Sequence, residues 1–178
     1  MKPWMVSVSV VFFFLVSACA TTPVPVGERA NPVVQTLENA SYRIAFEPKK
    51  TGGNFFRIFA LTVQNKGSGD VEIDWNRTRY LYEGKEAAGF VFQGITPADV
   101  SAGSIPSDVV PGGGTYFREI APHRLIAFAP IRDKSIAPGK SGISAGPLPG
   151  GRNGISLALR KDGKLTRETL EVSIEVLY

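Results

Sequence analysis

The sequence has very few of the residues that form disulfides and most metal centres, with one cysteine and one histidine among 178 residues. One thiol cannot close a disulfide within the chain, and one histidine cannot supply a histidine-rich metal cluster. Once the thiol of Cys19 is used for another purpose, a cysteine nucleophile and a cysteine-ligated metal are excluded as well. We expect no cofactor and no metal.

Long apolar runs are also missing. The longest is the mostly apolar stretch of residues 5–16, and it is shorter than the roughly 20 residues that a membrane-spanning helix needs. A short basic start at Lys2 precedes it, and the small residues Ser17 and Ala18 follow it. This arrangement is typical of an export signal peptide and predicts one over residues 1–18.

The signal peptide ends in the residues VSAC, at positions 16–19. This motif resembles the lipobox of bacterial lipoproteins. The resemblance implies cleavage before Cys19, a thioether-linked diacylglycerol on its sulfur and acylation of the new amine. Several acyl chains anchor a protein durably, because each buried methylene adds about 0.8 kcal/mol. The alternative is an ordinary signal peptide that leaves Cys19 as a free thiol.

The residue after the lipobox indicates a location. Ala20 stands where an aspartate would favour retention in the inner membrane. By resemblance to lipoprotein sorting in Gram-negative bacteria, we expect a cell-envelope protein anchored in the outer membrane and facing the periplasm. The next residues carry Pro23, Pro25 and Pro32 and predict an extended tether over residues 19–36. One domain is expected over residues 37–178.

A two-residue period of apolar side chains dominates this domain and predicts strands. The pair Asp162 and Gly163 predicts a tight hairpin turn. Residues 83–85 predict a second turn, about which TRYLY would pair with GFVFQ. Inward sets are Tyr42, Ile44 and Phe46; Phe59, Leu61 and Val63; Val71, Ile73 and Trp75; Ile155, Leu157 and Leu159; and Leu170, Val172, Ile174 and Val176.

The count of about eight short strands, with no amphipathic helix, predicts an all-β fold. The spacing resembles that of an immunoglobulin-like antiparallel β-sandwich. The segments LTVQNKGSGDVEIDWN, VVPGGG and GISLALRKDGKLTRETLEVSIEV also look like small bacterial lipoproteins of unassigned function, over about residues 55–178. These are turn and strand motifs, so the resemblance supports a fold and implies no activity.

Several motifs that could carry chemistry have simpler interpretations. APGKSG, at residues 137–142, lacks the earlier glycine and the following helix of a phosphate loop, so we interpret it as a loop. PGGGT, at residues 111–115, leads into a strand and predicts a sharp turn. His123 has no nucleophile motif to serve and is interpreted as a solvated turn residue. An oxygen-only calcium site from three aspartates is left open, although their spacing matches no known loop: Asp70, Asp74 and Asp99.

The segment DWNRTRY, at residues 74–80, is the richest in polar and aromatic groups. Arg77, Arg79 and Tyr80 are the candidate partner contacts, because guanidinium groups bind carboxylates and an aromatic ring offers a flat face. The competing interpretation is structural: the arginines face solvent, and Trp75 fills the centre of the sandwich.

Function is narrowed to three alternatives. The favoured one is a non-catalytic binding or assembly module; the others are an envelope enzyme and a structural spacer. Basic residues are scattered, so no nucleic-acid partner is expected, and another envelope protein or an anionic envelope polymer fits better. Two long loops, at residues 94–114 and 130–153, are expected to form the partner-facing surface side by side near the tether. A kink at Pro122 would instead place them at opposite ends.

Overall fold

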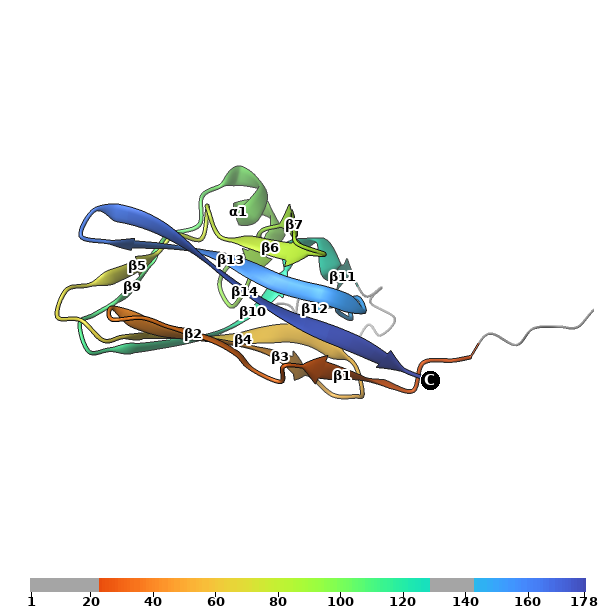
Figure 1. The fold of residues 1–178 in the computed structure, drawn as a ribbon. Coiled ribbons are helices and arrows are strands. Elements are labelled where there is room, and N and C mark those ends of the chain that lie inside the picture. The colour runs from red at the N-terminus through yellow and green to blue at the C-terminus, as the bar shows by residue number, and fades with distance from the viewer. Residues whose placement is uncertain (1–22, 129–142) are drawn as a thin grey trace, which may run out of the picture.

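The structure is a computed structural model that describes residues 23–128 and 143–178. Two antiparallel sheets lie face to face as the layers of a sandwich, so the all-β sandwich predicted from the sequence is confirmed (Figure 1). The signal peptide, Cys19 and residues 137–142 lie outside the described residues. In the described part of the chain, no helix has the length and apolar character needed to cross a membrane.

The first sheet has seven strands. Its order is β1-β14-β13-β5-β9, and β6 joins it by pairing with β13 and carries β7 at its side. Strands β13 and β14 form the long C-terminal hairpin, with eleven paired positions. The bounds are β1 (Gly27–Asn31), β5 (Val71–Ile73), β6 (Arg79–Tyr82), β7 (Lys85–Ala88), β9 (Asp108–Val110), β13 (Gly151–Lys161) and β14 (Lys164–Leu177).

The second sheet has five strands in the order β2-β3-β4-β10-β8. A separate two-stranded sheet pairs β11 with β12, and one short α-helix and one 3-10 helix complete the described elements. The bounds are β2 (Gln35–Glu38), β3 (Tyr42–Lys50), β4 (Phe56–Asn65), β8 (Phe90–Val91), α1 (Pro97–Ala102), β10 (Thr115–Pro122), η1 (His123–Leu125), β11 (Ile126–Phe128) and β12 (Ile143–Ala145).

The core lies between the two sheets and is built by the alternation seen in the sequence. Of the predicted inward residues only Val176 is not fully buried. Phe46 of β3 stacks on Phe59 of β4 with ring centroids 4.3 Å apart. Trp75 is also buried, as expected. Each such side chain contributes about 2 kcal/mol by leaving water, and together these residues hold the sheets face to face.

The tight turns are as predicted, but one strand pairing is not. Glu83 and Gly84, like Asp162 and Gly163, have positive φ, as a two-residue hairpin turn requires. β6 pairs with β7 about the first of these turns, whereas β8 pairs with β10 in the other sheet. The predicted pairing of TRYLY with GFVFQ is therefore wrong: the partner of β6 is Lys85–Ala88, which comes before GFVFQ in the chain. The chain crosses between sheets at Gly89, where a Cβ would lie 2.7 Å from Val100 of α1.

The domain begins earlier than predicted. β1 lies within residues 19–36, which were expected to form the tether, and it pairs with β14 over five positions. Its sequence GERAN has no apolar alternation, so nothing local marked it as a strand. β1 exists because the edge of β14 is available to it, which is a property of the tertiary fold.

The first predicted long loop is also different. Residues 94–114 contain α1 and β9, and β9 extends the first sheet beside β5. The segment therefore crosses between elements and does not form one loop at one end of the sandwich. The second predicted loop is described only from Ile143, where β12 begins. The prediction of one long loop at residues 94–114 is thus wrong, whereas residues 130–142 of the second loop lie outside the described residues.

Candidate functional site

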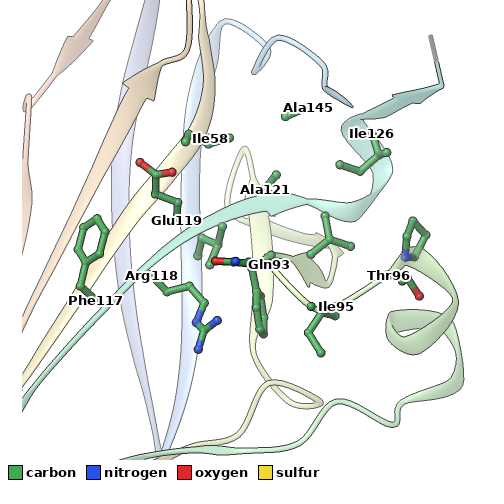
Figure 2. A pocket seen from close by; sticks show the side chains of 15 residues that line it. Ile58, Gln93, Ile95, Thr96, Phe117, Arg118, Glu119, Ala121, Ile126 and Ala145 are labelled. Atoms are coloured by element: carbon green, nitrogen blue, oxygen red, sulfur yellow. The ribbon is translucent and has the colours of Figure 1, made fainter. Parts of the chain in front are cut away.

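An open groove of about 680 Å³ lies beside β10 (Figure 2). One wall is the outward side of β10, and the other is the segment from Val91 to Pro97. Ile126 of β11 and Ala145 of β12 close one end of the groove. Residues 94–97, at the start of the first predicted loop, and Ala145, in the described part of the second, therefore line the same groove.

The free edge of β10 runs along this groove. In the described part of the chain, β10 has two neighbours: β4 along its length, and β8 opposite only Ala121 and Pro122. Thr115 to Ile120 thus have a paired strand on one side only. Unpaired backbone N–H and C=O groups on such an edge can accept another strand.

The ladder with β4 determines which backbone groups face outward. The amide of Asn65 donates to the carbonyl of Gly114 at 2.9 Å, so the backbone of Gly114 faces β4. Direction alternates along an antiparallel strand, so the even-numbered positions of β10 face β4. The backbone groups of Thr115, Phe117 and Glu119 consequently face the open edge.

The outward side chains of β10 are apolar at one position and acidic at another. Phe117 is 61% exposed, although it is a large aromatic residue. Glu119 is exposed and forms no ion pair with any of the described residues. Ile58 of β4 and Ala121 extend the apolar lining. The groove therefore offers an apolar surface with the carboxylate of Glu119, which none of the described residues neutralises in an ion pair.

The inward side chains of β10 form a polar clamp between the sheets. Asp108 of β9 accepts hydrogen bonds from Trp75 Nε1 at 2.7 Å and from the hydroxyl of Tyr116 at 2.6 Å. Arg118 lies 3.3 Å from the other oxygen of Asp108 and donates to the hydroxyl of Tyr116. Burial and the neighbouring carboxylate raise the pKa of Tyr116 above its usual range. Arg118 thus has its ion-pair partner, Asp108, on the inner side of the sheet.

Aromatic rings complete the clamp. The guanidinium of Arg118 lies 4.8 Å from the ring centroid of Phe92 and 5.3 Å from that of Tyr116. The indole of Trp75 packs against Phe92 with centroids 4.6 Å apart. Cation–π contacts of this kind favour a fixed guanidinium plane. These contacts therefore hold the guanidinium of Arg118 in one position beside the groove.

Local sequence explains the opposite wall. The amide of Ile95 donates to the carbonyl of Phe92 at 2.8 Å, and Gly94 provides the positive φ that this turn requires. Thr96 then caps α1 in a capping box with Asp99, whose pKa is lowered by the hydrogen bonds from Thr96. The turn and the cap direct the chain away from β10 and leave its edge open.

A second cavity, of about 520 Å³, lies on the other side of α1. It is lined by Arg79, Glu86 and His123 together with Trp75 and Ile105. His123 is in η1, and its backbone amide donates to the carbonyl of Gly89. This cavity is smaller and more polar than the groove beside β10.

The three candidate contacts from the sequence do not form one surface. Arg77 is exposed and lies 3.5 Å from Asp74, whereas Arg79 is half-buried at the second cavity. Tyr80 is only 3% exposed, and its hydroxyl donates to Asn153. Tyr80 is a core residue, so its prediction as a partner contact is corrected: its ring is packed in the hydrophobic core between the sheets.

The remaining candidates are accounted for by their local roles. Asp74 contacts Arg77 and Arg160, and Asp99 caps α1. Over residues 23–128 and 143–178, no three His, Cys, Asp or Glu side chains gather as a metal site would require. The PGGGT segment forms the predicted turn, in which the amide of Gly114 donates to the carbonyl of Pro111.

Sequence reasoning missed Phe117, Arg118 and Asp108. The segment TYFREI does carry a signal, because its alternation places Phe117 on the same side as Glu119 and opposite Ile120. Asp108 carries no comparable signal, since its partners lie in β10 and after β5 and are brought together only by the fold.

Comparison of the chain with protein-family models, curated proteins and solved structures found no match.

Proposed function

We propose that this protein is a lipid-anchored component of the bacterial cell envelope, attached to the outer membrane through Cys19 and facing the periplasm. We propose further that it is a non-catalytic binding or assembly module, and that its partner-facing surface is the groove beside β10. The partner is another envelope component. The observation that carries this proposal is an open groove that runs along an unpaired strand edge.

The chemistry of the groove favours binding. Binding sites are concave and mostly apolar, with a few placed polar groups. The groove has this character, with Phe117, Ile58 and Ile95 beside the polar ends of Arg118 and Glu119. Exposed aromatic residues are enriched where proteins meet, and Phe117 is the most exposed phenylalanine among the core and surface hydrophobics of the described chain.

An envelope enzyme is the competing function, and the second cavity is where it would act. His123, Glu86 and Arg79 line that cavity and could supply an acid, a base and an anion contact. The two functions are distinguished by location: a binding module depends on Phe117, whereas an enzyme depends on His123.

The proposed function is tested in cells with a photoreactive amino acid. Placed at Phe117, it should form a covalent adduct with a specific envelope component. The matched position is Thr36 on β2, which is exposed on the opposite edge of the same sheet and should form no adduct. Loss of the adduct on His123→Ala, or equal adducts from both positions, would contradict the groove as the working surface.

Membrane attachment is tested separately. Cells that express the full chain are labelled with a clickable fatty acid, and Cys19→Ala is compared with the natural sequence. The natural protein should carry label and fractionate with the outer membrane, whereas Cys19→Ala should carry none. Equal labelling of the two proteins would end the lipid-anchor proposal.

A further inference from the structure

The groove beside β10 is fitted to one class of ligand. We propose that it binds an extended polypeptide segment of the partner, which adds to the second sheet as a new strand alongside Thr115–Ile120. The segment carries an apolar side chain opposite Phe117 and a lysine or arginine two residues away, opposite Glu119. This inference rests on the proposed function, because it names the ligand of that same groove.

The backbone of β10 supplies the main contacts. Thr115, Phe117 and Glu119 each direct an N–H and a C=O to the open edge, as the ladder with β4 requires. These groups repeat every second residue, which is the spacing that an added strand presents. Peptides bound in this way gain affinity from main-chain hydrogen bonds and specificity from alternate side chains.

The space beside this edge has the length of a short strand. β8 occupies the neighbouring position only opposite Ala121 and Pro122, and the turn at Phe92–Ile95 then carries the chain away. Six residues of β10 remain, which span about 20 Å at a rise of about 3.3 Å per residue. The groove of about 680 Å³ is lined by the Phe117–Ala121 part of β10, so among the described residues the position beyond β8 is open to a ligand there.

The side chains set the sequence of the ligand. Phe117 and Glu119 are two residues apart and therefore share one face of the sheet. An added strand has the same period, so its residues opposite them are also two apart. Phe117 favours an apolar partner, and the carboxylate of Glu119, which has no ion-pair partner among the described residues, favours a cation. Arg118 points to the other face, where Asp108 already engages its charge, so that face requires no acidic residue.

A second copy of this chain fits the same edge less well. Two β10 strands can pair across a two-fold axis, but only their odd-numbered positions face each other through hydrogen bonds. Those positions are Thr115, Phe117, Glu119 and Ala121, and none of them carries a positive charge. No register therefore places a cation opposite Glu119, and a self-pair leaves two carboxylates unneutralised.

The test uses the purified full chain and labelled eight-residue peptides, with binding followed by fluorescence anisotropy. One peptide has valine and lysine two positions apart within an otherwise threonine-rich strand sequence. Its matched control has glutamate in place of the lysine. A third peptide keeps the lysine but has alternate backbone nitrogens methylated on the side that would face β10.

The lysine peptide should bind on the order of tenfold more tightly than the glutamate peptide, because an opposite-charge pair replaces a like-charge pair across the strands. Glu119→Lys should invert this order, and Phe117→Ser should weaken both peptides. Glu38→Lys, on the opposite edge of the sheet, should change neither. Backbone methylation should abolish binding, since it removes the donors that the edge requires. Unfolding midpoints of the variants show that each is folded.

The failures are distinguishable. An adduct at Phe117 in cells, with no charge inversion and no effect of methylation, would overturn strand addition and leave the proposed function standing. The absence of both the adduct and peptide binding would overturn both. A dimer that Phe117→Lys converts to a monomer would assign the edge to a second copy and overturn the peptide proposal.

Discussion

The two edges of the five-stranded sheet are built differently. β2 closes one edge with only four residues, and its exposed Glu38 lies 2.9 Å from Lys66 and 3.8 Å from Arg43. β10 leaves six residues open at the other edge and exposes Phe117 there. Short strands and charged side chains are common ways to protect an edge from unwanted pairing. The β2 edge has both of these protections, whereas the open stretch of β10 is longer and exposes the aromatic ring of Phe117 beside the charged Glu119.

This difference has a physical lesson. A long open edge that exposes an aromatic side chain is an aggregation hazard unless a ligand covers it, so its position beside a groove favours a binding role. The charged side chains at the β2 edge, such as Glu38, show that this fold accepts charges that block strand pairing at an edge where no ligand binds. The same sheet can thus be closed on one side and receptive on the other.

The interior behind the two edges differs as well. Behind β10, Asp108 gathers Trp75, Tyr116 and Arg118 into one clamp. Next to β2, the hydroxyl of Tyr42 on β3 donates to Glu168 of β14 at 2.6 Å and lies 3.4 Å from the hydroxyl of Thr166. The open edge is thus supported by a clamp in which one carboxylate gathers three side chains, and this keeps its backbone preorganised for an incoming strand.

The largest effect is expected at Trp75. Trp75→Ala removes a buried ring that packs on Phe92 and should destabilise the fold by about 3–5 kcal/mol. Denaturant unfolding measures this change. Trp75→Phe is the matched control, since it keeps a ring and loses only the hydrogen bond to Asp108. A small effect of the alanine variant would show that the clamp does not support the β10 edge.

A smaller but unequal effect is expected from Asp108 and Glu168, two of the acids that link the sheets. Asp108→Ala leaves Trp75 Nε1, Tyr116 and Arg118 without their acceptor and should cost about 3 kcal/mol. Glu168→Ala breaks one link to Tyr42 and should cost about 1 kcal/mol. Asp108→Asn, which keeps an acceptor, should fall between them. Equal losses from the two alanine variants would remove the distinction between the edges.

High pH should lower the stability of the fold through tyrosines near both edges of the five-stranded sheet. Burial raises the pKa values of Tyr42, Tyr80 and Tyr116. Glu168 raises the pKa of Tyr42 further, and Asp108 does the same for Tyr116. The unfolded phenol, with a pKa of about 10, then loses its proton first. The stability that these groups contribute is present below that pH and is lost as the pH rises above it. Thermal unfolding at increasing pH should show this decline, and Tyr116→Phe should make it shallower; an unchanged slope would contradict it.

The smallest change in stability is expected at Glu38. This carboxylate lies at the surface and its ion pairs are exposed, so Glu38→Val should leave the unfolding midpoint unchanged within error. It should nevertheless increase self-association, because it removes the charge that protects the β2 edge. Light scattering at increasing protein concentration measures this. Unchanged scattering would mean that the short length of β2, and not its charge, protects that edge.

Part of this structure could be predicted from local sequence. The two-residue period identified the buried faces of β3, β4, β13 and β14, because side chains alternate between the faces of any strand. The turn at Asp162 and Gly163 was equally local, since it depends on two adjacent φ values. The prediction of Tyr80 as a contact was wrong because the polar and aromatic residues around it do not reveal which face of the strand its side chain occupies.

By itself, the sequence determined the alternation of apolar residues, the tight turns and hence the sandwich, since each depends on residues close together in the chain. It also carries the lipobox-like motif that motivates the proposed anchor. Only the tertiary structure decided that GERAN is a strand and that Asp108 meets Trp75 across 33 positions of sequence. It also decided that β8 covers only the end of β10, on the side away from β4. The reason is that an open edge and a cross-sheet clamp are defined by which distant segments become neighbours, and no local pattern encodes that choice.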